Sequence, residues 1–261
     1  MSKPLEHATE EKLHREHPER FSANYGKVTW AKQVAVEHCL RLGPKKLLDC
    51  PAQNVWLCEQ FTAKKIPCVA ADIAFPEETI TSSDGLLSVR RVDLNEALPF
   101  DDGEFGAIIC LEGVEHCENP SLIMREFARC LSPAGVLFLS CPNVLNIKSR
   151  FKYLLRGSYY GFPHLISGEE SPDGHRHLTP ASYPLLSYLA ESNGLRVAEL
   201  YHQGLKRKYL PFLPLAGLVK GLVHIGARFV SSPQKRALQL GLVSSPVLLS
   251  DQLLFRAEKT S

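Results

Sequence analysis

The sequence lacks the paired cysteines that mark a structural zinc site. None of its eight cysteines belongs to a C-x-x-C pair, so we expect no metal centre. Several fall inside predicted strands and helices, where a free thiol packs as a small apolar group that a reducing cytosol keeps reduced. The eight are Cys39, Cys50, Cys58, Cys68, Cys110, Cys117, Cys130 and Cys141.

A large excess of charge of one sign is also absent. Lys and Arg total 30 and Asp and Glu total 28, a net charge of +2, which does not favour nucleic acid as a partner. Residues 1–20 contain no apolar run after a basic start, so we expect no secretory signal and a cytoplasmic protein. With 44% hydrophobic and 22% charged residues, the composition is that of a globular protein.

Helical and strand patterns alternate along most of the chain. Helices are predicted at 28–42, 54–65, 121–131 and 180–191. Strands are predicted at 46–49, 68–72, 87–92, 107–111, 136–141, 195–201 and 252–257. Strands separated by helices form crossover units, which predicts an α/β fold with seven strands in a mostly parallel sheet and helices on both faces.

Two stretches interrupt this alternation, at about 143–178 and 202–246. We predict one domain over 27–261 that carries these stretches as insertions, preceded by an N-terminal arm, 1–26. Specificity tends to reside on loops held by a rigid scaffold, so the insertions are expected to form a helical and loop cover that contacts the substrate.

The most specific pattern runs from Asp93 to Asn143. It begins with Asp93-Leu94-Asn95 and Leu98-Pro99-Phe100-Asp101-Asp102, and after an apolar strand continues with Glu115-His116-Cys117-Glu118-Asn119-Pro120. A helix, Pro133-Ala134-Gly135, a second apolar strand and Cys141-Pro142-Asn143 follow.

This order resembles the second half of class I S-adenosylmethionine-dependent methyltransferases, in the group that includes the ubiquinone-biosynthesis-type enzymes. The resemblance covers about 45–201 and the last strand. It implies a Rossmann-like sheet whose last strand inserts antiparallel between two others, and S-adenosyl-L-methionine as cofactor.

The resemblance also implies which residues bind that cofactor. Asp49, Asp72 and Asp93 end or follow successive strands, and ligands of open α/β sheets bind at that edge. In the family, the residue at Asp72 accepts hydrogen bonds from the ribose and the residue at Asp93 from the adenine amino group. One such aspartate could simply cap a helix or turn, but three at successive strand ends favour the cofactor. The predicted set is Asp49, Cys50, Ala52, Gln53, Asp72, Ile73, Asp93, Leu94, Leu111 and Glu112.

The first motif departs from the family pattern D-x-G-x-G-x-G. Its glycine positions hold Pro51, Gln53 and Val55, although glycine serves there because the backbone must turn tightly close to the ligand. Gln53 is the largest departure, because it places a long amide beside the cofactor. An inactive methyltransferase-like binding or scaffold module therefore remains an alternative. A dinucleotide-dependent oxidoreductase is disfavoured, because no G-x-G-x-x-G follows the first strand.

Methyl transfer aligns a sulfonium methyl with an acceptor, and needs a base only where a hydroxyl must lose its proton. The group resembled favours oxygen of a small molecule, a lipid-linked intermediate or a saccharide. His116 is a candidate base, with packing or hydrogen bonding as its alternative role, and His175 and His177 of the first insertion are further candidates. Asn119 is expected to cap the following helix, with Pro120 at its first position.

The second insertion contains a basic and apolar segment at 206–230. Prolines and charges interrupt its apolar run, so we do not expect it to span a bilayer. Lys220, His224 and Arg228 recur every fourth residue and form one face of a predicted helix. The opposite face holds Leu218, Leu222, Ile225 and Phe229. Such a helix would contact an anionic membrane surface or pack as a lid on the domain.

Overall fold

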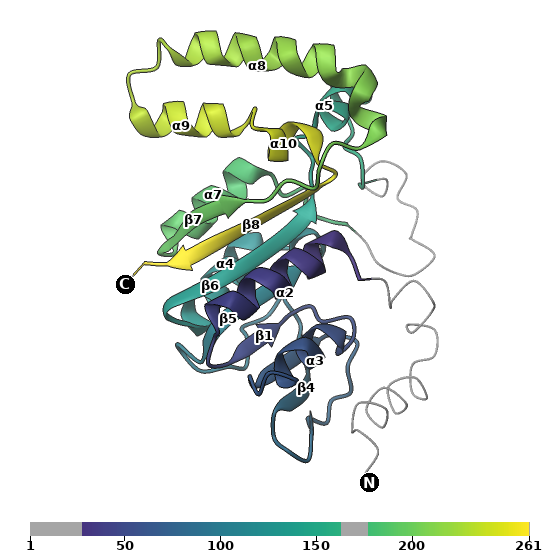
Figure 1. Ribbon diagram of the computed structural model, residues 1–261, viewed down its shortest axis with the longest axis vertical. Coiled ribbons are helices and arrows are strands. Elements are labelled where there is room, and N and C mark those ends of the chain that lie inside the picture. Colours follow the sequence, from purple (N-terminus) through teal and green to yellow (C-terminus); the bar gives the residue numbers. More distant parts are fainter. Residues whose placement is uncertain (1–27, 163–176, 261) are drawn as a thin grey trace.

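The computed structural model describes residues 28–162 and 177–260, which form one central sheet flanked by helices (Figure 1). Eight strands lie in the order β3-β4-β2-β1-β5-β6-β8-β7. They are β1 (Leu47–Asp49), β2 (Cys68–Asp72), β3 (Ile80–Thr81), β4 (Leu87–Arg91), β5 (Phe105–Leu111), β6 (Leu131–Pro142), β7 (Leu195–Leu200) and β8 (Gln252–Lys259). The predicted arm, 1–26, lies outside the described residues.

The five strands β4, β2, β1, β5 and β6 are parallel, and β8 lies antiparallel between β6 and β7. The predicted α/β class and the inserted last strand are confirmed. The prediction of seven strands missed β3, which pairs with the edge strand β4 through two residues and is too short to show a periodic pattern. The chain builds outward from β1 to β4 and then returns to β5, so strand order reverses between β1 and β5.

Helices cover both faces of the sheet. Helices α2 (Trp30–Leu42) and α3 (Trp56–Thr62) pack on one face, where Ala35, Phe61 and Ile109 share a buried core. Helices α4 (Pro120–Cys130) and α7 (Tyr183–Ser192) pack on the other, around Phe127 and Leu186. Alternate residues of β5 enter the two cores, as expected for a strand buried on both sides.

Local sequence signals set the ends of these helices. Thr29 caps α2 by accepting from the Lys32 amide, and Gly43 ends it in the left-handed conformation, which glycine adopts without strain. The Asn119 side chain accepts from two amides at the start of α4, with Pro120 at the first position. This capping is as the sequence predicted.

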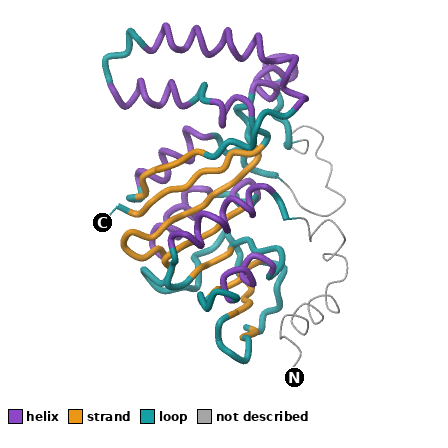
Figure 2. The backbone as a smooth tube through the Cα atoms, viewed as in Figure 1, coloured by secondary structure: helices purple, strands orange, loops and turns teal. Residues whose placement is uncertain are grey.

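The two insertions form a small helical unit beside the sheet. It comprises α5 (Ile147–Arg156), the 3-10 helix η2 (Arg207–Phe212), α8 (Leu213–Ala227), α9 (Pro233–Gly241) and α10 (Ser245–Leu249). Figure 2 shows α8 and α9 as a helical hairpin at one end of the molecule. A third core, which includes Ile147, Tyr209, Ala216 and Leu248, attaches this hairpin.

The segment expected to be too interrupted for a membrane span is continuous helix. Residues 207–227 form a helical run of 21 residues with a mean hydropathy of 1.5, of which 11% is buried. By length and composition alone this run is long and apolar enough to cross a membrane, so its prolines and charges do not exclude a span on those two criteria. Pro211 lies in the 3-10 turn and Pro214 in the first turn of α8, where a missing amide costs no helical hydrogen bond.

Two cysteines differ from the interpretation as free thiols. Cys58 in α3 and Cys68 at the start of β2 form a disulfide, because the short connection between these elements brings their Cα atoms within 5.5 Å. The other six cysteines are buried and free. Burial raises the pKa of the Cys39 thiol to about 12, so it stays protonated and packs as an apolar group.

Candidate functional site

Acidic residues line the edge of the sheet where the parallel strands end. Asp49 is the last residue of β1 and Asp72 of β2, and Asp93 follows β4. The reversal of strand order beside β1 places this edge where open α/β sheets bind their ligands. The three aspartates predicted from sequence therefore share one edge.

Asp72 holds the loop after β1 in place. Its side chain is 8% exposed, and its two oxygens accept from the amides of Gln53 and Ala74, each at 2.9 Å. Gln53 has a φ of 60°, the left-handed conformation for which the family pattern uses glycine. The backbone of a glycine-rich loop is thus present here without the glycine.

The other residues of this loop point into the protein. Cys50, Ala52 and Val55 are buried, and Val55 belongs to the core beneath α2 and α3. The branched Val55 side chain therefore packs in the core. Only Pro51 and Gln53 of the three departures from the glycine pattern retain partial exposure.

Asp49 has a partner that the sequence analysis did not identify. Its carboxylate is 2% exposed, and Oδ2 accepts no hydrogen bond among the described residues. Burial raises the pKa of Asp49 well above its usual range, which the attraction of buried Lys32 opposes. Lys32 lies on the buried face of α2, three residues before Ala35 and seven before Cys39. A lysine among the apolar positions of a helix is the sequence signal that could have revealed this partner of Asp49.

Apolar side chains accompany the aspartates. Ile73, directly after Asp72, is 47% exposed, although it is a large hydrophobic residue beside a buried strand. Leu94 is partly buried against the core, and Leu111 is buried at the end of β5. Asp93 Oδ1 accepts from the backbone and side-chain nitrogens of Asn95, which fixes a tight turn after β4.

The turn after β5 packs against the loop after β1. Glu112 has a φ of 54°, and its Oε1 accepts from the Ser140 hydroxyl at 2.9 Å. A Cβ atom at Gly113 would meet Pro51 Cδ at 2.4 Å, so only glycine fits between the two segments. The 3-10 helix η1 (Val114–His116) follows at once.

This turn brings together Glu115, His116 and His177, whose possible ligand atoms all lie within 4.8 Å of one another. The two imidazole rings meet edge to face, with their centroids 4.8 Å apart. Glu115 is fully buried, and burial, together with the Glu112 carboxyl, raises its pKa well above its usual range. Sequence analysis named both histidines but missed Glu115; an acid three residues after Glu112 was the available signal. His175 lies outside the described residues.

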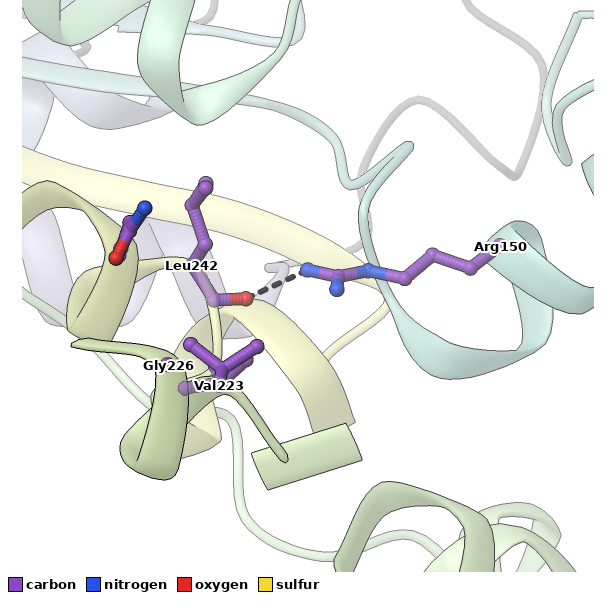
Figure 3. Close-up of a pocket in the computed structure, with 6 residues that line it drawn as sticks. Arg150, Val223, Gly226 and Leu242 are labelled. Atoms are coloured by element: carbon purple, nitrogen blue, oxygen red, sulfur yellow. Dashed lines mark hydrogen bonds between the residues drawn. The ribbon is translucent and has the colours of Figure 1, made fainter. Parts of the chain in front are cut away.

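A separate cavity of about 280 Å³ lies between α5, α8 and α9. Figure 3 shows the Arg150 side chain extending from α5 to the Leu242 carbonyl oxygen, to which it donates a hydrogen bond at 2.5 Å. Val223, Gly226, Gln239 and Val243 complete the lining. None of the strand-end aspartates lines this cavity, so it is distinct from the site described above.

Comparison with known proteins agrees with this geometry. A family model described as a methyltransferase domain matches residues 54–139. This match, together with the sheet described above, supports a class I S-adenosylmethionine-dependent methyltransferase. That family and fold imply S-adenosylmethionine as the cofactor.

Two relatives with low sequence identity to this chain are named as O-methyltransferases. The ubiquinone biosynthesis O-methyltransferase of Dechloromonas aromatica is 24% identical over 179 residues, which cover 67% of this methyltransferase and 75% of that protein. The enzyme of the same name from Xanthomonas oryzae pv. oryzae is 31% identical over 109 residues, 40% of this chain and 46% of that one. The second match therefore spans less than half of the relative.

A solved structure shares the fold. The YcgJ protein of Bacillus subtilis superimposes with a TM-score of 0.50 at 13% identity, covering 88% of this methyltransferase and 98% of that chain. At this identity the likeness concerns the fold alone.

Proposed function

We propose that this methyltransferase is a cytoplasmic enzyme that transfers the methyl group to a hydroxyl oxygen of a small-molecule, lipid-linked or saccharide acceptor. The observation that carries the proposal is the position of Glu115, His116 and His177 immediately after β5, beside the acidic edge formed by β1 and β2. The names of the two curated relatives, both O-methyltransferases, support oxygen as the acceptor atom.

In this proposal the cofactor lies along the carboxyl ends of β1, β2 and β4. Asp72 accepts from the ribose hydroxyls, and Asp93 from the adenine amino group. The exposed Ile73 side chain packs on the adenine ring, which gives an otherwise unexplained apolar surface a partner. Asp49 and Glu112 lie toward the methionine end, together with the backbone of Cys50, Ala52 and Gln53, while Leu94 and Leu111 line the apolar floor.

Methyl transfer to a hydroxyl requires that the acceptor oxygen be aligned with the methyl carbon and that the hydroxyl lose its proton. The acceptor oxygen attacks the methyl carbon, the carbon–sulfur bond breaks, and S-adenosylhomocysteine leaves as a neutral thioether. A hydroxyl acceptor releases its proton, and His116 and His177 are the titratable groups placed to assist that loss. Oxygen methylation therefore explains why two histidines meet at the end of β5.

Two measurements test the proposal. Binding of S-adenosylhomocysteine is measured first by thermal unfolding; ligand at about 100 times its dissociation constant adds roughly 2.7 kcal/mol, a Tm rise of roughly 5 to 10 °C. Labelled S-adenosylmethionine is then incubated with pools of hydroxylated small molecules, lipid extracts and saccharides. Binding without transfer to any pool would contradict the enzymatic proposal and favour the scaffold alternative, and no Tm rise would reject the cofactor site itself.

We also propose that 206–230 contacts an anionic membrane surface. Along α8, Leu218, Leu222 and Ile225 are more than half exposed, and Phe229 just beyond it is 85% exposed. The side of α8 facing the third core contains Ala216, which is buried. The outward side is therefore an unusually large apolar surface for a helix in water.

Charge on the same helix supports a lipid surface as the partner. Lys220, His224 and Arg228 are exposed along one side of the apolar face, and Lys208 lies just before it in η2. An apolar face bordered by cations is the composition of helices that lie in the membrane interface. Because Ala216 is buried in the third core and Val219 and Val223 pack against it, we propose that α8 lies on the membrane surface and does not span the bilayer. A lid role alone would leave the outward apolar face unexplained.

The domain organisation completes the proposal. We propose that 27–261 forms one methyltransferase domain, and that its two insertions act together. The first would cover the acceptor beside His177, and the second would hold the domain at a membrane from which a lipid-linked acceptor could enter.

A further inference from the structure

The helical unit beside the sheet is strongly basic. Residues 143–162 contain four Lys and Arg, residues 201–250 contain seven, and neither range contains an Asp or Glu. Asp251, which follows the second range directly, pairs with Lys206 and Lys208. Because the whole chain has a net charge of only +2, the rest of the chain is net negative. The helical unit is therefore the part of the molecule that attracts an anionic ligand.

Arg150 places one of these cations at the wall of the cavity between α5, α8 and α9 (Figure 3). Its Nε donates to the Leu145 carbonyl oxygen at 2.7 Å, and its Nη2 to the Leu242 carbonyl oxygen at 2.5 Å. Two of the five N–H donors of the guanidinium are thus used, and Nη1 has no partner in the described part of the chain. The side chain is held in place by neutral carbonyls, with donors left to bind an anion.

The charge of Arg150 is not compensated within the protein. Burial lowers the pKa of its guanidinium, and no carboxylate opposes that shift. Arg129, which is also partly buried, differs: it pairs with Glu126 and Asp102, and its hydrogen bonds to these two carboxylates raise its pKa. A partly buried cation without a counter-ion is costly, which an anion bound in the cavity would relieve.

The rest of the cavity is apolar on its inner side and open on the other. Val243 is buried in the third core, and Val223 packs against that core. Gly226 and Gln239 are exposed, so the cavity opens to solvent on their side. Its volume, about 280 Å³, is just below the range of sites that enclose a whole drug-sized ligand. The cavity can therefore enclose a charged group and the first part of an apolar chain, with the remainder of the chain outside.

Hydrogen bonds connect this cavity with the edge of the sheet. Ser149, which precedes Arg150, accepts from the Tyr160 amide at 3.2 Å. The carbonyl oxygen of the next residue, Gly161, lies 2.6 Å from Nδ1 of His177, one of the two histidines proposed to assist proton loss. Arg150 and His177 are thus joined through a few adjacent residues, and one elongated ligand can contact both side chains.

We propose that this cavity binds the phosphate of a lipid-linked acceptor, with the Arg150 guanidinium on the phosphate and Val223, Leu242 and Val243 against the apolar chain. A guanidinium binds two phosphate oxygens at once, and a phosphate monoester carries about two negative charges at neutral pH. The proposal names the class of acceptor, a hydroxylated lipid phosphate, and therefore rests on the proposed function. The transfer step is unchanged: the oxygen–carbon bond forms, the carbon–sulfur bond breaks, and the phosphate does not react.

Octyl phosphate, a phosphate ester with one apolar chain, is the probe for binding. Calorimetry with the full chain, without cofactor, measures its Kd below the concentration at which it forms micelles. Inorganic phosphate and octyl glucoside are titrated in parallel. Octyl phosphate should bind at least about tenfold more tightly than either, because it combines charged hydrogen bonds with burial of apolar area. Equal binding of inorganic phosphate or of octyl glucoside would overturn the proposal, as would no binding of octyl phosphate.

Two variants test whether the cavity is the site. Arg150→Gln removes the guanidinium, and Gly226→Leu fills the cavity at a position where an added Cβ meets nothing within 4 Å, so the fold is retained. Each should weaken octyl phosphate binding by at least about tenfold. Arg156→Gln at the exposed end of α5 and Gly221→Leu outside the lining are matched controls and should bind as the wild type does. Unchanged binding by Gly226→Leu, or equal losses in the controls, would overturn the site.

Methyl transfer separates this proposal from the proposed function. Where a lipid extract accepts label, excess octyl phosphate and Gly226→Leu should each reduce the transfer, while S-adenosylhomocysteine raises the Tm of the variant as it does for the wild type. Transfer that neither change reduces would overturn the assignment of the acceptor and leave oxygen methylation intact. Octyl phosphate binding without transfer to any pool would reject the enzymatic proposal, and with it the role of the cavity in holding an acceptor.

Discussion

The Gln53 amide donates to Asp72 Oδ2 at 2.9 Å, while Gln53 itself occupies the left-handed region with a φ of 60°. The loop after β1 is thus held in the shape of a glycine-rich loop by a buried aspartate at the end of β2. The conformation costs a non-glycine residue about 1 to 2 kcal/mol, which the surrounding hydrogen bonds must offset.

Gln53→Gly should therefore stabilise the protein. Relief of the left-handed strain outweighs the extra backbone entropy of glycine, about 0.5 to 1 kcal/mol, by a small margin. We expect a Tm rise of about 1 to 3 °C by calorimetry. Gln60→Gly, within helix α3, is the matched control and should lower the Tm, because glycine weakens a helix. A lower Tm for Gln53→Gly would mean that the amide side chain makes a contact that outweighs the strain.

Asp72→Asn should weaken S-adenosylhomocysteine binding. The amide keeps one acceptor oxygen but loses the negative charge, and a hydrogen bond to a charged group contributes about 1.5 to 3 kcal/mol. We expect an increase in Kd of roughly 10- to 150-fold by calorimetry. The exposed Asp101, replaced by Asn, provides the control and should leave the Kd unchanged. An unchanged Kd for Asp72→Asn would remove this residue from the cofactor site.

Continuous apolar runs located the central strands, because β1, β2, β5 and most of β6 are buried on both faces. Strand β2 matches its predicted range, 68–72, residue for residue. The two-residue β3 carries no such signal. The strand-end aspartates were predictable because parallel strands place their carboxyl ends together.

Contacts between segments far apart in the chain could not be predicted from the sequence. Nothing in the local pattern shows that His177 returns to η1, since that contact depends on the Thr179 and Leu178 hydrogen bonds. The outward exposure of Leu222 was also hidden, because a helix with charges on one side and leucines on the other does not reveal which side faces the core.

Gly113→Ala should disturb two parts of the site together. The new Cβ would meet Pro51 Cδ at 2.4 Å, so the loop after β1 and the turn after β5 must separate. Overpacking of this kind costs about 1 to 3 kcal/mol, and we expect a lower Tm and weaker S-adenosylhomocysteine binding. Gly217→Ala in α8 meets nothing within 4 Å and should raise the Tm slightly, because alanine favours helix. Equal effects at the two positions would contradict the packing of Gly113 on Pro51.

Asp251 should make attachment of the helical hairpin depend on pH. Burial alone would raise its pKa, but hydrogen bonds from Lys208, Lys206 and Tyr209 lower that pKa to about 2. Since the folded pKa lies below the unfolded value of about 4, the stabilisation is complete above pH 4 and is lost as the pH falls toward 2.

Asp251→Asn should accordingly lower the free energy of unfolding by roughly 2 kcal/mol at neutral pH, with the difference from wild type shrinking below about pH 4. Urea unfolding at several pH values measures it. Asp101→Asn, at an exposed position, is the control. A difference that stays constant down to about pH 3 would show that the carboxylate charge does not hold the hairpin.

The outward face of α8 should determine membrane binding. Leu222→Ser combined with Phe229→Ser should reduce sedimentation with anionic vesicles, because each side chain loses apolar area that the lipid would bury. Lys220→Glu with Arg228→Glu should abolish it at low salt, since each basic residue near the surface contributes about 1 kcal/mol. Leu42→Ser, at an exposed leucine ending α2, should sediment as the wild type does. Added salt should weaken wild-type binding through screening of these charges. If wild-type protein remains in the supernatant at low salt, α8 does not bind lipid. The reversals at Lys220 and Arg228 should then change only the Tm.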